Sequence, residues 1–343
     1  MPQKAIVLCV AAALLAALAA GCGGDPTPGA SSAPARKVIK ISIGLNEDSH
    51  EYQGLNKFKE EIEKNTDGRY RVQLYANAQL GDDVKAVEAL LAGTLEMTVP
   101  STSPLTGLSQ ELGVFDLPFL FPDAATAYKV LDGPVGQKIL DNLAARGVVG
   151  LAYWDNGFRH LTNSVREIRT PADVKGLKIR TMQNPVHLAA WEALGADPVP
   201  MPFSELFAAM QTRKIDGQEN PVPTIYQQKF VEVQKYCTLT GHIYTPFVVL
   251  ISKKVWDGMP PGDQAIFRAA ALAARDHERL VSAAMNSSQV EQLRQQGMTV
   301  TALSPEQLKA FRDAVAPATA RFADQIGQDI VQAVQDEVGQ YAQ

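Results

Sequence analysis

Hydrophobic and polar residues follow two periods along the chain, and the two periods alternate from residue 38 onward. Residues 38–43 alternate with a period near two, which predicts a strand, whereas residues 52–65 carry Leu55, Phe58 and Ile62 at helical spacing. The same order then repeats, with strands expected at 70–75 and 95–99 and a helix at 84–91. This alternation predicts an α/β domain built around a mainly parallel sheet.

The second half of the chain continues the pattern and adds longer helices. We expect helices at 133–146, 185–194, 204–212 and 261–296, and strands at 148–154, 178–180 and 247–251. Capping residues mark two further helix starts, one at Thr170 before Pro171 and one at Ser304, which opens the sequence S-P-E-Q. The pattern therefore predicts two α/β lobes followed by helices that brace them.

The first 22 residues are expected to be a signal peptide. Lys4 precedes an apolar run at 6–20, which is too short to span a membrane. The run ends in L-A-A-G-C, which resembles the lipobox of bacterial lipoproteins, and this resemblance implies lipidation of Cys22. Ordinary cleavage near Ala20, with Cys22 incidental, is the alternative.

Residues 23–36 consist mainly of Gly, Pro, Ser, Thr and Ala, which predicts a flexible tether. We therefore expect an exported protein, located in the periplasm or on the extracytoplasmic face and anchored there if Cys22 is acylated. Cys9 leaves with the signal peptide, so Cys237 is the one remaining thiol besides Cys22 and no internal disulfide is expected. Cys237 is interpreted as a core residue.

Composition and charge narrow the range of partners. The sequence of 343 residues is 46% hydrophobic and 20% charged, which is typical of a folded globular protein. Without Lys4, 31 basic residues stand against 37 acidic residues, so 31 − 37 gives a formal net charge of −6. Nucleic acid and anionic membrane surfaces are therefore not expected as partners.

Sequence signatures of common enzymes are missing. The chain contains no G-x-S-x-G, no Walker A loop, no H-E-x-x-H and no C-x-x-C. His277 lies between Asp276 and Glu278, but consecutive residues of a helix point in different directions and cannot converge on one ion. We expect no metal, no cofactor and no enzymatic activity.

Three motifs carry the strongest information in the chain, namely Y-W-D-N-G-F-R-H-L-T-N at 153–163, G-L-K-I-R at 176–180 and D-G-Q-E-N-P at 216–221. Two further motifs accompany them, Q-L-G-D-D at 79–83 and M-P-F-S-E at 201–205. In this order and spacing they resemble the DctP-type solute-binding proteins of tripartite ATP-independent periplasmic (TRAP) transporters. The resemblance covers nearly all of the chain that follows the signal peptide.

The resemblance implies a two-lobed fold with a ligand cleft between the lobes and a long helix crossing both. Lobe I is expected to comprise 37–156 and 245–284, and lobe II 157–244 and 285–343. The implied function is the extracytoplasmic solute-binding subunit of a TRAP transporter, which captures a small organic acid, closes, and delivers the acid to the small and large membrane subunits. The protein is expected to be a monomer, and the ion-gradient coupling of this family requires no ATP site.

The segments at 154–163 and 181–185 look closer to family members that bind C4-dicarboxylates or sugar acids. Sialic-acid-binding members carry an acidic residue and an arginine where this chain has Ser101 and Pro104, so sialic acid is not expected. Two other functions remain open on the sequence. A ligand sensor that reports to a membrane kinase would have the same pocket. An exported enzyme acting on organic acids would need a general base, for which Asp83 and His50 are the candidates.

Arg180 is the central candidate ligand-binding residue. It stands at the end of a short expected strand, and in α/β sheets ligands collect beyond the carboxyl ends of strands. A guanidinium offers a planar fork that matches a carboxylate with two charge-assisted hydrogen bonds. The resemblance identifies Arg180 with the family's carboxylate-binding arginine; without it, a surface ion pair would be the ordinary interpretation.

Three residues are expected to accompany Arg180. Arg159 matches a second pocket arginine, with a salt bridge to a neighbouring acid as the alternative. Asn220 matches a family contact to the ligand carboxylate and also reads as the cap of a helix starting at Pro221. Phe203 matches an aromatic residue that packs on the ligand, with core packing as the alternative. Further polar contacts are expected from Asn46, His50, Asp83, Ser101, Ser103 and Gln183.

Overall fold

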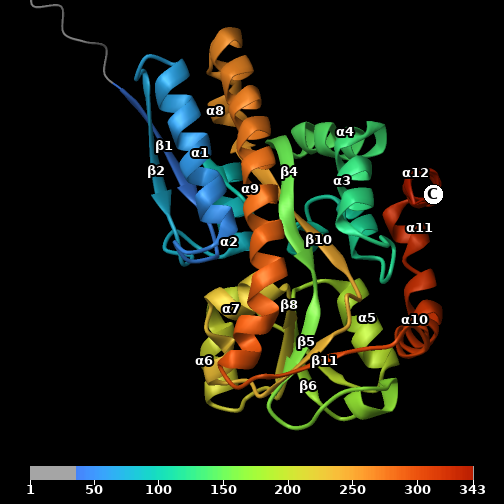
Figure 1. Ribbon diagram of the computed structural model, residues 1–343. Coiled ribbons are helices and arrows are strands. Elements are labelled where there is room, and N and C mark those ends of the chain that lie inside the picture. The colour runs from blue at the N-terminus through green and yellow to red at the C-terminus, as the bar shows by residue number, and fades with distance from the viewer. Residues whose placement is uncertain (1–35, 343) are drawn as a thin grey trace, which may run out of the picture. The chain divides into compact units, whose positions relative to one another are not determined.

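The computed structural model describes residues 36–342. Its fold is built on two β-sheets (Figure 1). In the first sheet the strand order is β2-β1-β3-β10-β4. Strand β1 pairs in parallel with β2 and β3, whereas β10 runs antiparallel to β3 and β4. The bounds are β1 Lys37–Ser42, β2 Tyr70–Tyr75, β3 Met97–Thr98, β4 Val148–Phe158 and β10 Tyr244–Ser252.

The second sheet has the strand order β11-β9-β5-β8-β6-β7. Parallel pairing joins β6 to β7 and β8, and β11 to β9, whereas β5 runs antiparallel to both β8 and β9. The bounds are β5 His160–Asn163, β6 Lys178–Thr181, β7 Asp197–Pro200, β8 Gly217–Asn220, β9 Tyr236–Leu239 and β11 Thr299–Ala302. Two sheets with many helices confirm the predicted α/β class.

Three segments link the two sheets. Strand β4 leaves the first sheet at Phe158 and continues through Arg159 directly into β5 of the second. Strand β9 returns to the first sheet through a short segment, 240–243, that leads into β10. The third link is helix α9 (Pro261–Gln295), which passes both sheets in Figure 1 and packs on α1 and β4 of the first sheet and on β11 of the second.

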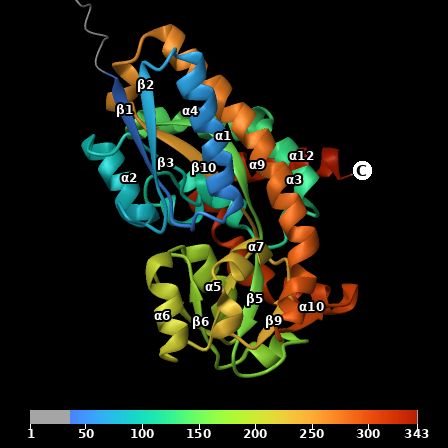
Figure 2. The same cartoon turned by 60° about the vertical axis from the view of Figure 1, so that its left-hand side comes forward.

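Helices cover both sheets, as Figure 2 shows from a second side. Those before residue 200 are α1 His50–Asn65, α2 Asp83–Ala92, α3 Ala124–Asp132, α4 Pro134–Asn142 and α5 Pro185–Ala193. Those after it are α6 Leu206–Gln211, α7 Val222–Gln227, α8 Lys253–Asp257, α9, α10 Pro305–Ala320, α11 Ala323–Ile326 and α12 Gln328–Tyr341. Across the described helices, none combines the length and apolar character needed to cross a membrane.

Helix α1 lies very close to α9 because Gly54 has no side chain. A Cβ atom at residue 54 would stand 2.7 Å from the ring of Trp154 and 2.8 Å from Cβ of Glu278. The indole of Trp154 donates to the carbonyl of Ala271 in α9 at 3.2 Å, and His50 Nδ1 lies 2.5 Å from Glu278 Oε1. These contacts hold β4, α1 and α9 together as one packed unit.

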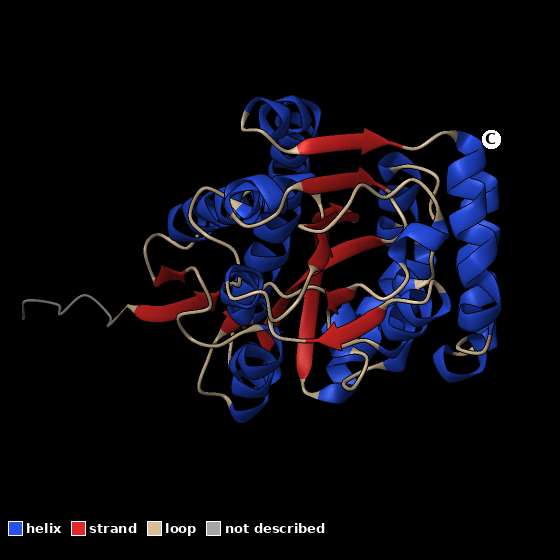
Figure 3. Ribbon diagram, turned by 90° about the horizontal axis from the view of Figure 1, so that it is seen from below, coloured by secondary structure: helices blue, strands red, loops and turns tan. Residues whose placement is uncertain are grey.

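The C-terminal helices lie along one edge of the molecule (Figure 3) and pack on different elements. Helix α10 packs on α5 and, through Phe311 and Val315, on the core of the second sheet. Helix α12 contributes Ile330, Val331 and Val334 to the core cluster that also contains Val130 of α3 and Ile139 of α4. Helix α12 therefore packs with elements of lobe I, whereas the boundary expected from the sequence had assigned 285–343 to lobe II. The apolar face of α12 is buried on α3 and α4, which accounts for the difference.

Of the three predicted helix starts, the structure confirms the one at Ser304. Ser304 caps α10 with Gln307 in a reciprocal capping box, which confirms that prediction. Thr170 opens only a single 3-10 turn, Pro171–Val174. Asn220 does not cap α7, because the residue that precedes this helix is Pro221 and Asn220 ends β8. The predicted signal peptide and Cys22 lie outside the described residues.

Candidate functional site

A cavity lies between the two sheets, where the carboxyl ends of parallel strands from both sheets meet. Gly44, which follows β1, and Ser101, which follows β3, line one side of it. Arg180 of β6, Pro202 after β7 and Asn220 of β8 line the other side. The space free of protein atoms, including the part open to solvent, is about 510 Å³. The position is the one at which open α/β sheets bind ligands.

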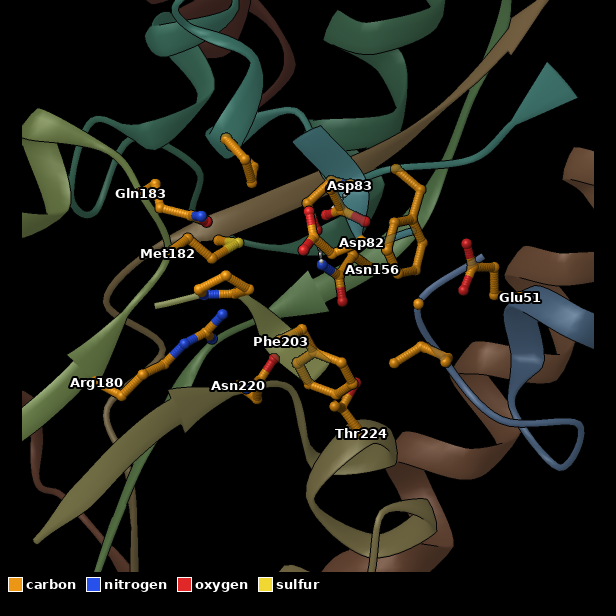
Figure 4. A pocket seen from close by; sticks show the side chains of 16 residues that line it. Glu51, Asp82, Asp83, Asn156, Arg180, Met182, Gln183, Phe203, Asn220 and Thr224 are labelled. Atoms are coloured by element: carbon orange, nitrogen blue, oxygen red, sulfur yellow. Dashed lines mark hydrogen bonds between the residues drawn. The ribbon is translucent and has the colours of Figure 1, made fainter. Parts of the chain in front are cut away.

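Arg180 is held rigidly at one side of this cavity. Its Nε and Nη2 atoms both donate to the carbonyl of Met201, at 2.9 and 2.7 Å. The residue is 2% exposed, and Nη1 has no hydrogen-bond partner within the described part of the chain. Figure 4 shows the guanidinium directed towards the cavity. The two N–H groups of Nη1 on this buried cation are thus left for a group that the described residues do not supply.

The charge of Arg180 persists at neutral pH. Burial and the positive charge of Arg159 lower the pKa of Arg180 to about 10, while Glu219 and Asp83 act in the opposite direction. Phe203 covers the guanidinium, with its ring centre 6.0 Å from the Arg180 Cζ atom. Arg180 and Phe203 therefore give the cavity a positive charge beside an aromatic wall.

Arg159 is placed differently from Arg180. It is not part of the cavity wall, because its guanidinium is buried behind Asn220 and pairs with Glu219. Arg159 Nε lies 2.5 Å from Glu219 Oε2, and Nη2 lies 3.0 Å from Oε1. Nη2 also donates to Asn220 Oδ1 at 3.2 Å. The structure thus shows the salt bridge that was the alternative interpretation of Arg159.

Glu219 is ionised in this buried layer. Burial alone would raise the pKa of Glu219, but Arg159, His242 and His187 outweigh it and hold the pKa well below the ordinary range. His242 Nε2 lies 3.2 Å from Glu219 Oε2. Because the charges of Arg159 and Glu219 compensate each other, the pair supports Asn220 from behind without adding net charge to the cavity.

The first sheet supplies mainly polar and acidic groups to the opposite wall. Asp83, at the first turn of α2, accepts from the Ser101 amide at 3.2 Å through Oδ2, and Asn156 of β4 donates to Ser101 Oγ at 2.9 Å. Burial raises the pKa of Asp83 to about 7, and nearby Asp82 adds to the shift, while the Ser101 amide and Arg180 oppose it. Asp83, Ser101 and Gln183, three of the residues predicted to contact the ligand, line the cavity.

Three expected ligand contacts lie elsewhere. His50 is buried between α1 and α9, where it pairs with Glu278. Asn46 donates to the carbonyl of Gln227 at 2.9 Å. This hydrogen bond connects the loop after β1 to α7, which lies on the side of the second sheet. Ser103 donates to Asp116. None of these three side chains lines the cavity in the described structure.

Four polar residues of the cavity wall were not predicted as ligand contacts, namely Glu51, Asp82, Asn156 and Thr224. Asp82 and Asn156 lie within the motifs at 79–83 and 153–163, whereas Glu51 and Thr224 do not. Glu51 of α1 is completely buried, and neither of its carboxyl oxygens has a partner among residues 36–342. Thr224 of α7 is 1% exposed and its hydroxyl is likewise unpartnered in the described chain. The only signal for Glu51 in the sequence is an acid immediately before the helix expected at 52–65.

The family model for bacterial extracellular solute-binding protein, family 7 (DctP), matches residues 41–325. The chain therefore belongs to this family of solute-binding proteins, and the resemblance seen in the motifs is confirmed. A solute-binding protein of Verminephrobacter eiseniae is 42% identical over 297 residues, which cover 87% of this chain and 88% of the relative.

Solved structures of relatives agree with the fold. The sugar acid binding protein DctPAm from Advenella mimigardefordensis, solved in complex with galactonate, is 41% identical, with a TM-score of 0.87 over 89% of this chain and 98% of that one. A TRAP periplasmic solute binding protein from Sulfurospirillum deleyianum, solved with bound succinate, is 34% identical, with a TM-score of 0.84 over 88% and 99%. These likenesses confirm the predicted two-lobed fold of TRAP periplasmic binding proteins.

Proposed function

We propose that this chain is the extracytoplasmic subunit of a TRAP transporter and that it captures a small organic acid through the carboxylate-binding group Arg180. The observation that supports this proposal most strongly is the free Nη1 atom of Arg180, buried and directed towards the cavity between the sheets. A ligand carboxylate would supply the missing acceptor and compensate the charge. Asn220 and Phe203 lie beside Arg180 and would orient the bound acid.

The proposed mechanism is closure of the two lobes around the acid. Walls from both sheets line the cavity, so a ligand held by Arg180 on one side gains contacts to Asp83, Ser101 and Asn156 only when the lobes are together. Such differential affinity shifts the population to the closed form. We further propose that the closed form is the one that docks on the membrane subunits, and that the acid is released there unchanged, without turnover.

A thermal-shift screen of the purified protein against organic acids tests this proposal. An acid that binds should raise the melting temperature of the wild type, because ligands that bind only the folded state stabilise it. Arg180→Ala should remove this shift while leaving a folded protein. Arg71→Ala, at an exposed position of β2, serves as the matched control and should retain the shift. If Arg180→Ala binds the acid with unchanged affinity, the proposed role of Arg180 is wrong.

A further inference from the structure

The charges along the cavity wall differ between its two sides. Arg180 is the one cationic side chain among the lining residues in the described range. Facing it from the first sheet's side are three acidic residues, Glu51, Asp82 and Asp83, with no lysine, arginine or histidine beside them in the wall. Arg159, the nearest other cation named above, is already paired with Glu219. The wall can therefore compensate one ligand carboxylate and has no cation for a second.

Unsatisfied polar groups occur on both sides of the cavity. Arg180 Nη1, both oxygens of Glu51 and the Thr224 hydroxyl are shielded from water and make no hydrogen bond within residues 36–342. Leaving a buried polar group unpaired costs about 1–3 kcal/mol. Since all three residues line the same cavity, a ligand that satisfies them would recover this cost. Such a ligand needs an anionic end for Arg180 and neutral hydrogen-bonding groups for the other two.

The positions of these groups suggest the arrangement of the ligand. Figure 4 shows Arg180 and Glu51 at opposite ends of the cavity, with Phe203 between them. Burial, together with the charges of Asp83 and Glu278, raises the pKa of Glu51 well above its ordinary value, although the Leu45 amide acts in the opposite direction. A protonated Glu51 carboxyl both donates and accepts hydrogen bonds, which suits a hydroxyl group.

We propose that the cavity selects a monocarboxylate that carries hydroxyl groups, with the carboxylate on Arg180 and hydroxyls on Glu51, Asp83 and Thr224, and that it disfavours an acid with a second carboxylate at its far end. This inference rests on the proposed function, because it assumes that Arg180 binds the carboxylate. Asp83 contributes Oδ1, which accepts no hydrogen bond in the described structure. Glu51 and Thr224 thereby become specificity-determining residues.

Two matched sets of acids test the inference by calorimetry on the wild-type protein. The first set has four carbons and comprises D-erythronate, butanoate without hydroxyls, and succinate with a second carboxylate. The second set has six carbons and comprises galactonate, hexanoate and galactarate. In at least one set the hydroxylated monocarboxylate should bind about tenfold or more tightly than both analogues, which corresponds to one satisfied buried hydrogen-bonding group.

Variants of the far side of the cavity give a second test. Glu51→Leu and Thr224→Val should each weaken binding of the hydroxylated acid about tenfold while leaving the affinity for the hydroxyl-free acid unchanged or higher. Both substitutions replace unpartnered polar groups by apolar ones, so the fold should persist. Glu60→Leu, at an exposed position of the same helix α1, should change neither affinity.

The outcomes separate this inference from the proposed function. If in neither set the hydroxylated monocarboxylate binds more tightly than the acid with a second carboxylate, and Arg180→Ala abolishes the binding of that acid, the proposed function stands and the selectivity is overturned. Equal losses of the hydroxylated and hydroxyl-free acids in Glu51→Leu also overturn it. If none of the six acids binds the wild type, the proposed function fails for these acids and the inference fails with it.

Discussion

Two buried arginines stand close to one cavity, and their partners decide what each can do. Two guanidinium nitrogens of Arg159 donate hydrogen bonds to the Glu219 carboxylate, so the charge of Arg159 is compensated inside the protein. Within residues 36–342 the hydrogen bonds of the Arg180 guanidinium go to the carbonyl of Met201, which compensates no charge. A buried cation without a counter-ion is costly unless a ligand supplies one. The two arginines thus have different roles, although both belong to the motifs of one family.

The Arg159–Glu219 pair leads to a prediction about stability. Glu219→Gln removes the negative charge and leaves Arg159 buried without compensation, so the free energy of unfolding should fall by about 3–5 kcal/mol. Urea denaturation measures this change. The matched control is Asp313→Asn, which breaks an exposed ion pair with Lys309 at 2.6 Å and should have little effect. Equal effects of the two substitutions would show that the buried pair has no special role.

Asp83 leads to a prediction about pH. Its folded-state pKa of about 7 lies above the ordinary value of 3.8, so at intermediate pH the folded protein holds a proton that the unfolded chain has released. The stability that Asp83 contributes is therefore fully present below about pH 4 and is lost as pH rises through about 7. Measured across this interval, the free energy of unfolding of the wild type should fall relative to that of Asp83→Asn. A constant difference between the two proteins would contradict the raised pKa.

At the residue scale, the sequence predicted the cavity residues of the second sheet better than those on helices α1 and α7. Arg180, Asn220 and Phe203 belong to motifs that end strands or directly follow them, and strand ends of the second sheet converge on the cavity. Glu51 and Thr224 lie on helices, where the direction of a side chain depends on how the helix is rotated against its neighbours. That rotation is set by packing against α9, which contacts both α1 and α7, and no local pattern reveals it.

At the scale of elements, most strands and helices followed from periodicity. Strand β2 has the predicted bounds 70–75, and α9 ends one residue from the expected position. Strand β3 is only Met97–Thr98, shorter than the expected 95–99, because just two residues pair with β1. Helix α12 went unpredicted, and its docking on α3 and α4 is a long-range contact that a local pattern does not contain.

The closeness of α1 and α9 gives a prediction at this scale. Gly54→Ala would place a Cβ atom 2.7 Å from Trp154, so the helix must shift, and overpacking of this kind costs about 1–3 kcal/mol. Gly339→Ala is the matched control, because this helical glycine in α12 has open space around it and alanine there should stabilise the protein by about 0.5–1 kcal/mol. Thermal unfolding should therefore move in opposite directions for the two variants, and a shared direction would contradict the packing described.

At the scale of the whole molecule, the site exists because two sheets face each other. The motifs lie far apart in sequence, at 79–83, 153–163, 176–180, 201–205 and 216–221, yet their residues contribute to one cavity or to the layer directly behind it. The crossings from β4 to β5 and from β9 to β10 are short, whereas α9 extends past both sheets. Short crossings of this kind suit hinge closure. In the proposed function, the two lobes close on the acid about these crossings.

The central claim of this account is that Arg180 binds the carboxylate of the ligand. A crystal structure of the protein with a bound organic acid tests it most directly. The account predicts a carboxylate oxygen at about 2.7–2.9 Å from Nη1 of Arg180, the distance of a charge-assisted hydrogen bond, with the rest of the acid between the two sheets. An acid bound at another place, with Nη1 of Arg180 still lacking a ligand oxygen, would contradict it.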